Sequence, residues 1–231
     1  TGKRIGKIVP QEIYLINWCE NQVIDKALFR GLRETKSNVF IYGVQSFIDY
    51  PPYLCRHIAK VDETFGMTPD VILANAPAYL DVRPAVAQKI GVSFRSGDLF
   101  RQSIHLEEKK QSVIFLPYHR ILSNEVIAVC AGVATLRDQY LPVTIHPASL
   151  TKHLPVLPPK WFYTKQNRFE LLAITALIIT SESSTSSEAA ALGTSVIIVA
   201  SQSSFTCNPM LAEGKGELWD IAFDPSEVDT L

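Results

Sequence analysis

One strand–turn–helix–strand stretch in the C-terminal half constrains the fold most. Its apolar runs, 177–179 and 196–199, have the length and β-branching of buried strands in a parallel sheet. Between them, a hydroxyl-rich turn over 181–187 leads into the helix-forming run 188–192, and Gly193 stands where a helix end favours a positive φ. Hydroxyls and free backbone N–H groups at a helix start, after a parallel strand, predict an anion site, and we expect the anion to be phosphate.

The N-terminal half has the pattern of a strand–helix–strand unit, which implies parallel pairing with a right-handed crossover. The elements expected there are a strand over 12–18, a helix over 22–35, strands over 39–44 and 70–74, a helix over 77–90 interrupted near Pro84, and a short strand over 91–94.

A polar segment over 95–110 separates this half from a fresh α/β series. The series contains a strand over 112–116, a helix over about 123–138, a strand over 142–145, a helix over 169–176, the stretch described first, and a last strand over 219–223. The predicted fold class is therefore α/β, with two Rossmann-like lobes and mainly parallel sheets. We expect an N-terminal lobe over 1–105 and a C-terminal, nucleotide-binding lobe over 106–231.

Two residue pairs carry a resemblance to a known family. His146-Pro147 and Ser183-Ser184 each follow an apolar strand, in that order. This pattern resembles GT-B glycosyltransferases of bacterial surface-carbohydrate biosynthesis, of the sialyl- and Kdo-transferase-like and CDP-glycerol glycerophosphotransferase-like types. Gly43-Val-Gln45 is similar to their Gly-x-Gln-His segment, with Ser46 in place of the histidine. The resemblance makes the N-terminal lobe the acceptor side. This lobe is short for such a two-lobed enzyme, and we expect its opening strands and helices to be missing.

The resemblance implies an enzyme that moves a sugar from a nucleotide-activated donor, CMP- or CDP-linked in preference to UDP-linked. The implied acceptor is a surface polysaccharide or a lipopolysaccharide, hence a glycan or glycolipid. It implies no metal and no cofactor, and a cytoplasmic location that allows peripheral association with the inner face of the membrane.

The phosphate of the nucleotide-sugar gains negative charge as the sugar leaves, and hydrogen-bond donors placed around the phosphate stabilise that charge. The residues expected to bind the donor nucleotide and its phosphate are His146, Pro147, Ser183, Ser184, Thr185 and Glu188. The resemblance gives Glu188 the ribose hydroxyls and His146 a catalytic role as well. These residues also have purely structural interpretations. His146 can be a loop histidine, the serine turn can be a helix N-cap, and Glu188 can be a first-turn acid favoured by the helix dipole.

Transfer to a hydroxyl needs a base within hydrogen-bond reach of the acceptor. Glu20 follows a strand and precedes a helix, so we expect it to face the cleft as that catalytic base, although it can equally be a simple helix-start acid. Asn21 would orient it. The weaker base candidates are Asp49 and Asp98, and the residues expected to line the cleft are Gln45, Tyr118, His119 and Arg120.

Bulk composition excludes several other classes. The 231 residues are 47% hydrophobic and carry a net charge of −1, which is typical of a soluble globular protein and argues against a nucleic-acid partner. Four scattered cysteines without a CxxC pair predict free thiols and no zinc site. Two further functions stay open: a sugar-nucleotide 2-epimerase-like enzyme, although its relatives have Asp-Ser-Gly-Gly where this chain has Ser-Glu-Ser-Ser, and a non-catalytic GT-B-like binding module.

Overall fold

The structure is a computed structural model that describes residues 1–8, 12–35, 38–45, 57–81, 84–91, 93, 96–102, 109–149 and 154–231. The chain forms two compact units, Thr1–Gly97 and Asp98–Leu231. The lobe boundary expected between 105 and 106 lies outside the described residues.

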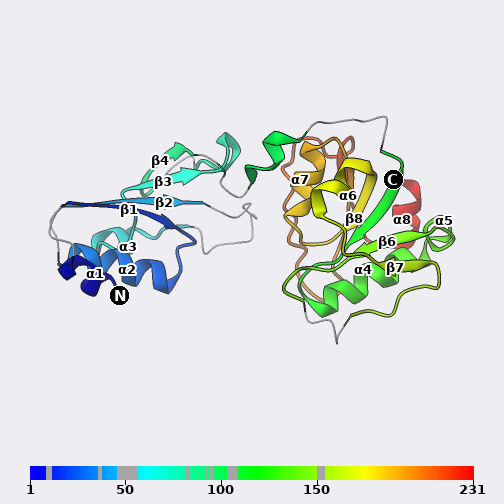
Figure 1. The fold of residues 1–231 in the computed structure, drawn as a ribbon, viewed down its shortest axis with the longest axis horizontal. Helices are drawn as coiled ribbons and strands as arrows, with labels where there is room; N and C mark the ends of the chain where they lie inside the picture. Colours follow the sequence, from blue (N-terminus) through cyan, green and yellow to red (C-terminus); the bar gives the residue numbers. More distant parts are fainter. Residues whose placement is uncertain are drawn as a thin grey trace. The chain divides into compact units, whose positions relative to one another are not determined.

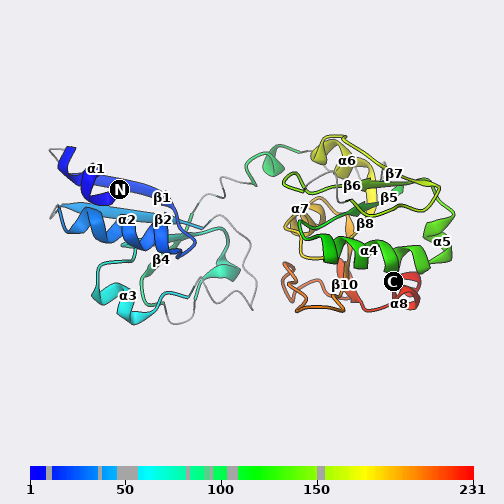
Figure 2. The same cartoon turned by 90° about the horizontal axis from the view of Figure 1, so that it is seen from below.

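Unit 1 is a four-stranded parallel sheet with the strand order β1-β2-β3-β4. Helices α1, α2 and α3 lie on one face of this sheet (Figures 1 and 2). The fully buried side chains Phe29 and Leu32 of α2 and Ile41 of β2 form the core of the unit. The elements are α1 (Gly2–Ile8), β1 (Ile13–Trp18), α2 (Val23–Arg33), β2 (Val39–Val44), α3 (Lys60–Thr64), β3 (Val71–Ala74), the 3₁₀ turn Pro77–Tyr79 and β4 (Ala87–Ile90).

The helix predicted over 77–90 is wrong. Pro77–Tyr79 is a single 3₁₀ turn, and Ala87–Ile90 forms β4, which pairs in parallel with β3. Ala, Gln and Lys favour helices intrinsically, but the open edge of β3 offers this segment a ladder of backbone hydrogen bonds, and tertiary pairing overrides a weak local preference.

Unit 2 is a six-stranded parallel sheet with the strand order β10-β9-β8-β5-β6-β7. The chain starts at the central strand β5, extends the sheet through β6 and β7, and returns to the other side of β5 with β8. The elements are the 3₁₀ turn Leu99–Arg101, β5 (Gln111–Phe115), α4 (Arg120–Gly132), α5 (Ala134–Arg137), β6 (Leu141–Thr144), β7 (Trp161–Tyr163), α6 (Arg168–Ile174), β8 (Thr175–Thr180), α7 (Thr185–Ala191), β9 (Ser195–Val199), β10 (Trp219–Ala222) and α8 (Pro225–Thr230).

Two hydrophobic clusters cover the two faces of this sheet. Val126 and Cys130 of α4 and Val228 of α8 pack with Ile114 of β5 on one face. On the other face, α6 and α7 pack against alternate residues of the same strands, with Leu172 among the fully buried side chains. The alternation along β5 and β8 therefore places α4 and α7 on opposite faces, as in a doubly wound sheet. Two parallel sheets in succession along the chain, of four and six strands, confirm the α/β fold class with two lobes.

Candidate functional site

The reversal of strand order between β5 and β8 defines where a site can form in unit 2. After β5 the chain enters α4 on one face, and after β8 it enters α7 on the other. The two connecting loops therefore diverge at the carboxyl ends of neighbouring strands, which is where doubly wound sheets bind ligands. His119, the N-cap of α4, and Glu182 stand on either side of this point.

A chain of side-chain contacts joins three loops along this edge. The Tyr118 ring meets the His119 ring edge-on at 5.2 Å and the His146 ring at 5.6 Å between centroids. His119 Nε2 lies 3.8 Å from Glu182 Oε1. The loops that follow β6, β5 and β8 thus present two imidazoles, a phenol and a carboxylate side by side.

His146 is held by its own turn. Its Nδ1 accepts a hydrogen bond from the backbone N–H of Ala148 at 3.2 Å, and Ser149 Oγ donates to the carbonyl of Tyr118 at 3.4 Å. Because Nδ1 acts as an acceptor, Nε2 is the nitrogen that carries the proton in the neutral ring. Pro147 follows His146 in the turn.

The serine turn differs from the sequence-based expectation of free backbone N–H groups. The N–H of Ser183 donates to Ser181 O at 2.8 Å, and that of Ser186 to Ser183 O at 3.0 Å. The N–H of Thr185 donates to Ser183 Oγ at 3.3 Å. The turn satisfies these donors internally, two through backbone carbonyls and one through the Ser183 hydroxyl. The side chains of Ser183 and Ser184 are half-buried at this turn.

Glu188 lies inside the unit. It is 4% exposed, and its Oε2 lies 3.2 Å from Nε of Arg168, whose guanidinium also stacks on the Phe169 ring. This ion pair ties α7 to the start of α6. The role at a ribose suggested by the resemblance stays a prediction, and it would require the Arg168 pair to rearrange.

Glu182 is a site residue that the sequence reasoning missed. Besides His119, its carboxylate contacts the Cys207 thiol, whose pKa is raised by burial, by the negative charge of Glu182 and by the hydrogen bond between the two groups. Its position directly before the Ser183-Ser184 pair was the available signal. The partner of Glu182 lies more than sixty positions earlier in the chain, so spacing alone could not reveal it.

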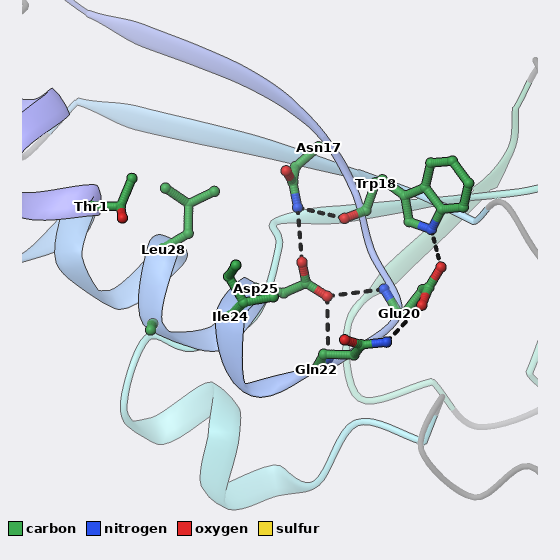
Figure 3. Close-up of a pocket in the computed structure, with 9 residues that line it drawn as sticks. Thr1, Asn17, Trp18, Glu20, Gln22, Ile24, Asp25 and Leu28 are labelled. Atoms are coloured by element: carbon green, nitrogen blue, oxygen red, sulfur yellow. Dashed lines mark hydrogen bonds between the residues drawn. The ribbon is translucent and has the colours of Figure 1, made fainter.

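In unit 1, Glu20 lies in a pocket of about 390 Å³ at the carboxyl end of β1 (Figure 3). Its carboxylate accepts hydrogen bonds from the indole N–H of Trp18 and from the Gln22 amide, the latter at 2.7 Å. The acid is therefore oriented by neutral donors, and it keeps lone pairs for a further donor.

Asp25 holds the turn that presents Glu20. It is 8% exposed and accepts from the backbone N–H groups of Glu20 at 3.0 Å and Gln22 at 3.1 Å, and from Asn17 Nδ2 at 3.1 Å. Asn21 has a positive φ of 57°, a conformation that asparagine tolerates better than most residues. Its side chain donates to the carbonyl of His57 rather than to Glu20.

The remaining candidates are placed as follows. Gln45 follows β2, and its side-chain oxygen accepts from the N–H of Asn75 at 3.2 Å. Asp98 is exposed before a 3₁₀ turn, 3.8 Å from Arg101. Arg120 is the exposed first residue of α4. Asp49, like Ser46, lies outside the described residues.

Within the described ranges, no three histidine, cysteine or acidic side chains gather as metal ligands would. Across those same ranges, none of the helices combines the length and apolar character needed to cross a bilayer.

The fold and its carboxyl-edge loops define a chain with two Rossmann-like units, and solved structures share this architecture. The glycotransferase of kitacinnamycin is similar with a TM-score of 0.53 and 12% identity, over 99% of this chain and 68% of that one. An alpha,alpha-trehalose-phosphate synthase (UDP-forming) from Burkholderia vietnamiensis has a TM-score of 0.53 and 13% identity, over 99% of this chain and 65% of that one. The chain thus spans about two thirds of each, and at such identities the likeness shows the fold.

A scan against protein-family models gave no match, and a search of curated proteins gave no significant one.

Proposed function

We propose that this chain belongs to a glycosyltransferase that moves a sugar from a nucleotide-activated donor to a glycan or glycolipid acceptor without a metal. The observation that carries the proposal is the contact chain His146–Tyr118–His119–Glu182 at the strand-order reversal of a GT-B-like second unit. The likeness of the whole chain to a glycotransferase and a sugar-phosphate synthase in fold supports the same reaction class.

The donor phosphate would lie against Nε2 of His146 and the hydroxyls of Ser183 and Ser184. An imidazole N–H and two hydroxyls can follow the charge that grows on the phosphate as the sugar leaves. CMP- or CDP-linked donors are the finer proposal, and they rest on the His-Pro and Ser-Ser pairs. The same resemblance supports a surface-polysaccharide or lipopolysaccharide acceptor and a cytoplasmic reaction at the inner face of the membrane.

Glu20 is the base we propose for the acceptor hydroxyl. Its free lone pairs and its position in a pocket support this role, since a base must reach the proton that it removes. The Trp18 and Gln22 donors fix the direction in which the carboxylate faces.

The proposal predicts that His146→Ala weakens binding of CMP or CDP by about 1.5–3 kcal/mol, the usual value for a hydrogen bond to a charged group. Titration calorimetry with CMP, CDP, UDP and GDP measures this effect. Cytidine, which has no phosphate, should bind the variant and the wild-type protein nearly equally.

His57→Ala is the matched control, because His57 is an exposed histidine of unit 1. Equal losses for nucleotide and nucleoside, or an effect of His57→Ala as large as that of His146→Ala, would contradict the phosphate site. Product analysis with the preferred donor then separates a transferred sugar from a free epimer, or from binding without turnover.

A further inference from the structure

The pocket at Glu20 has two unlike ends. Glu20 and Gln22 form the polar end, where the indole N–H of Trp18 donates a hydrogen bond to Glu20 (Figure 3). Ile24, Ala27 and Leu28, along one flank of α2, form the apolar end. Ile24 is 73% exposed, so a large apolar side chain is presented to solvent beside a fixed carboxylate.

The charges of the lining limit what the polar end can accept. Asp25 already accepts three hydrogen bonds and is 8% exposed, so it contributes mainly negative charge and little acceptor capacity to the pocket. Glu20 has two of about four lone-pair directions in use and can accept from two more donors. Among the described residues that line the pocket, none is a lysine, arginine or histidine, and Thr1 lies beside Leu28 at the apolar end (Figure 3). At the Glu20 end, a ligand group is therefore favoured when it donates hydrogen bonds and disfavoured when it is an anion.

The apolar end of the pocket favours a ligand that carries an apolar group. Covering Ile24 and Leu28 removes apolar surface from water, which favours a ligand with an apolar group next to its hydroxyls. A volume of about 390 Å³ lies within the range of small-molecule sites and suits one sugar ring with an apolar substituent.

We propose that this pocket binds an uncharged sugar that carries an apolar group, with sugar hydroxyls donating to Glu20 and the apolar group against Ile24 and Leu28. As a binding site it is independent of the donor site. The further statement that this sugar is the acceptor rests on the proposed transferase function.

Trp18 supplies the probe for the experiment. Its indole N–H donates to Glu20, whereas those of Trp161 and Trp219 donate to the carbonyls of Leu136 and Glu213 from buried rings. The chain has three tryptophans, so an ¹⁵N-labelled sample shows three indole signals, and Trp18→Phe identifies the one that reports on Glu20. The other two are internal references.

Phenyl glucoside should shift the Trp18 signal in a saturable way, with a dissociation constant on the order of 1–10 mM for a ligand of this size. Phenyl glucuronide differs by one carboxylate and should bind about tenfold more weakly, because it meets the charge of Glu20. Glu20→Gln should reduce that difference to about twofold or less.

A second pair of variants tests the apolar end. Ile24→Ser should weaken phenyl glucoside about fivefold while changing the much weaker binding of glucose little, since glucose lacks the apolar group. Val23→Ser is the matched control, because Val23 is 84% exposed on the same helix and does not line the pocket.

The inference fails if phenyl glucoside leaves the Trp18 signal unmoved at about 50 mM, if the glucuronide binds as well as the glucoside, or if Val23→Ser and Ile24→Ser act alike. None of these outcomes bears on whether a nucleotide binds at His146, so the proposed donor site is tested separately. Loss of nucleotide binding with intact glucoside binding would instead overturn the proposed transferase and leave the sugar pocket standing.

Discussion

At the scale of single residues, carboxylates organise the loops that follow the strands. Asp25 accepts hydrogen bonds from two backbone N–H groups and an amide in unit 1, and Glu125 of α4 accepts from hydroxyls and backbone N–H groups of the loop after β9. Glu125 Oε2 accepts from Ser201 Oγ at 3.0 Å and from the N–H of Gln202 at 3.2 Å. Burial alone would raise the pKa of Glu125, but hydrogen bonds from Ser203, Ser201 and Gln202 outweigh it, and the pKa is lowered.

A lowered pKa in the folded state makes this contact a source of pH-dependent stability. The unfolded chain holds the proton more tightly, so the contribution is complete above the ordinary value of 4.5 and is lost as the pH falls below it. We expect Glu125→Gln to lower the free energy of unfolding by about 1 kcal/mol at pH 7, because the group is partly exposed. The difference from wild type should shrink between pH 4.5 and 3, as measured by urea unfolding.

Glu217→Gln, which changes an exposed glutamate of the same unit, is the control for the general loss of a negative charge. A Glu125→Gln effect that is constant from pH 7 to pH 3 would show that the carboxylate charge is not what holds the loop.

At the scale of elements, the end of α7 shows how one residue stops a helix. Gly193 has a φ of 73°, and its N–H donates to Ala190 O at 2.9 Å while that of Thr194 donates to Ala189 O at 3.0 Å. This is the pair of hydrogen bonds of a Schellman motif. The motif turns the chain directly into β9, so the position of the helix end also sets the start of the strand.

Gly193→Ala should therefore destabilise unit 2 by about 1–2 kcal/mol, the cost of a side chain in the left-handed region. Gly193→Asn should cost clearly less, since asparagine visits that region more readily. Urea unfolding of the two variants gives the comparison. Equal stability of the alanine variant and the wild-type protein would mean that the turn relaxes to a negative φ.

Elements were predictable where the local pattern and the tertiary pairing agree. The alternating and β-branched runs predicted β1, β2, β3, β5, β6, β8, β9 and β10, and Gly193 marked the end of α7. The short strand β7 was not predicted, because Trp161–Tyr163 follows a proline-rich segment and gains its order from pairing with β6. Helix α4 begins at Arg120 rather than Ser123, because His119 in extended conformation starts it directly after the β5 loop.

The site was predictable only in part, for a related reason. Strand ends mark which residues reach the carboxyl edge, so the placement of Tyr118, His119, His146 and the serine pair on that edge follows from the sequence. Contacts between loops depend on strand order, which no local pattern specifies. Glu182 beside His119, and Arg168 beside Glu188, therefore emerged only from the structure.

At the scale of the whole molecule, the described residues of both hydrophobic clusters in unit 2 all belong to unit 2 itself. Lys109 adds a polar anchor: its ammonium donates to Leu172 O at 2.6 Å and Thr194 Oγ1 at 2.7 Å, and burial lowers its pKa. Lys109, which lies shortly before β5, is thus tied to α6 and to the residue that precedes β9.

We expect residues 98–231, expressed alone, to unfold in one cooperative transition with a free energy in the ordinary range of about 5–15 kcal/mol. Urea unfolding followed by tryptophan fluorescence measures it, since Trp161 and Trp219 are both buried in this unit. A fragment that binds hydrophobic dyes and melts without a transition would show that unit 2 needs unit 1 to fold.

The edge where β5, β6 and β8 end has an evolutionary consequence. Each strand contributes its side chains through a separate loop, and the hydrogen-bond ladder between the strands stops before those loops begin. Substitutions or insertions in one loop can therefore alter recognition without shifting strand register, whereas the buried strands tolerate little change. Related proteins can therefore keep the same sheet while their loops differ, and so differ in what they bind.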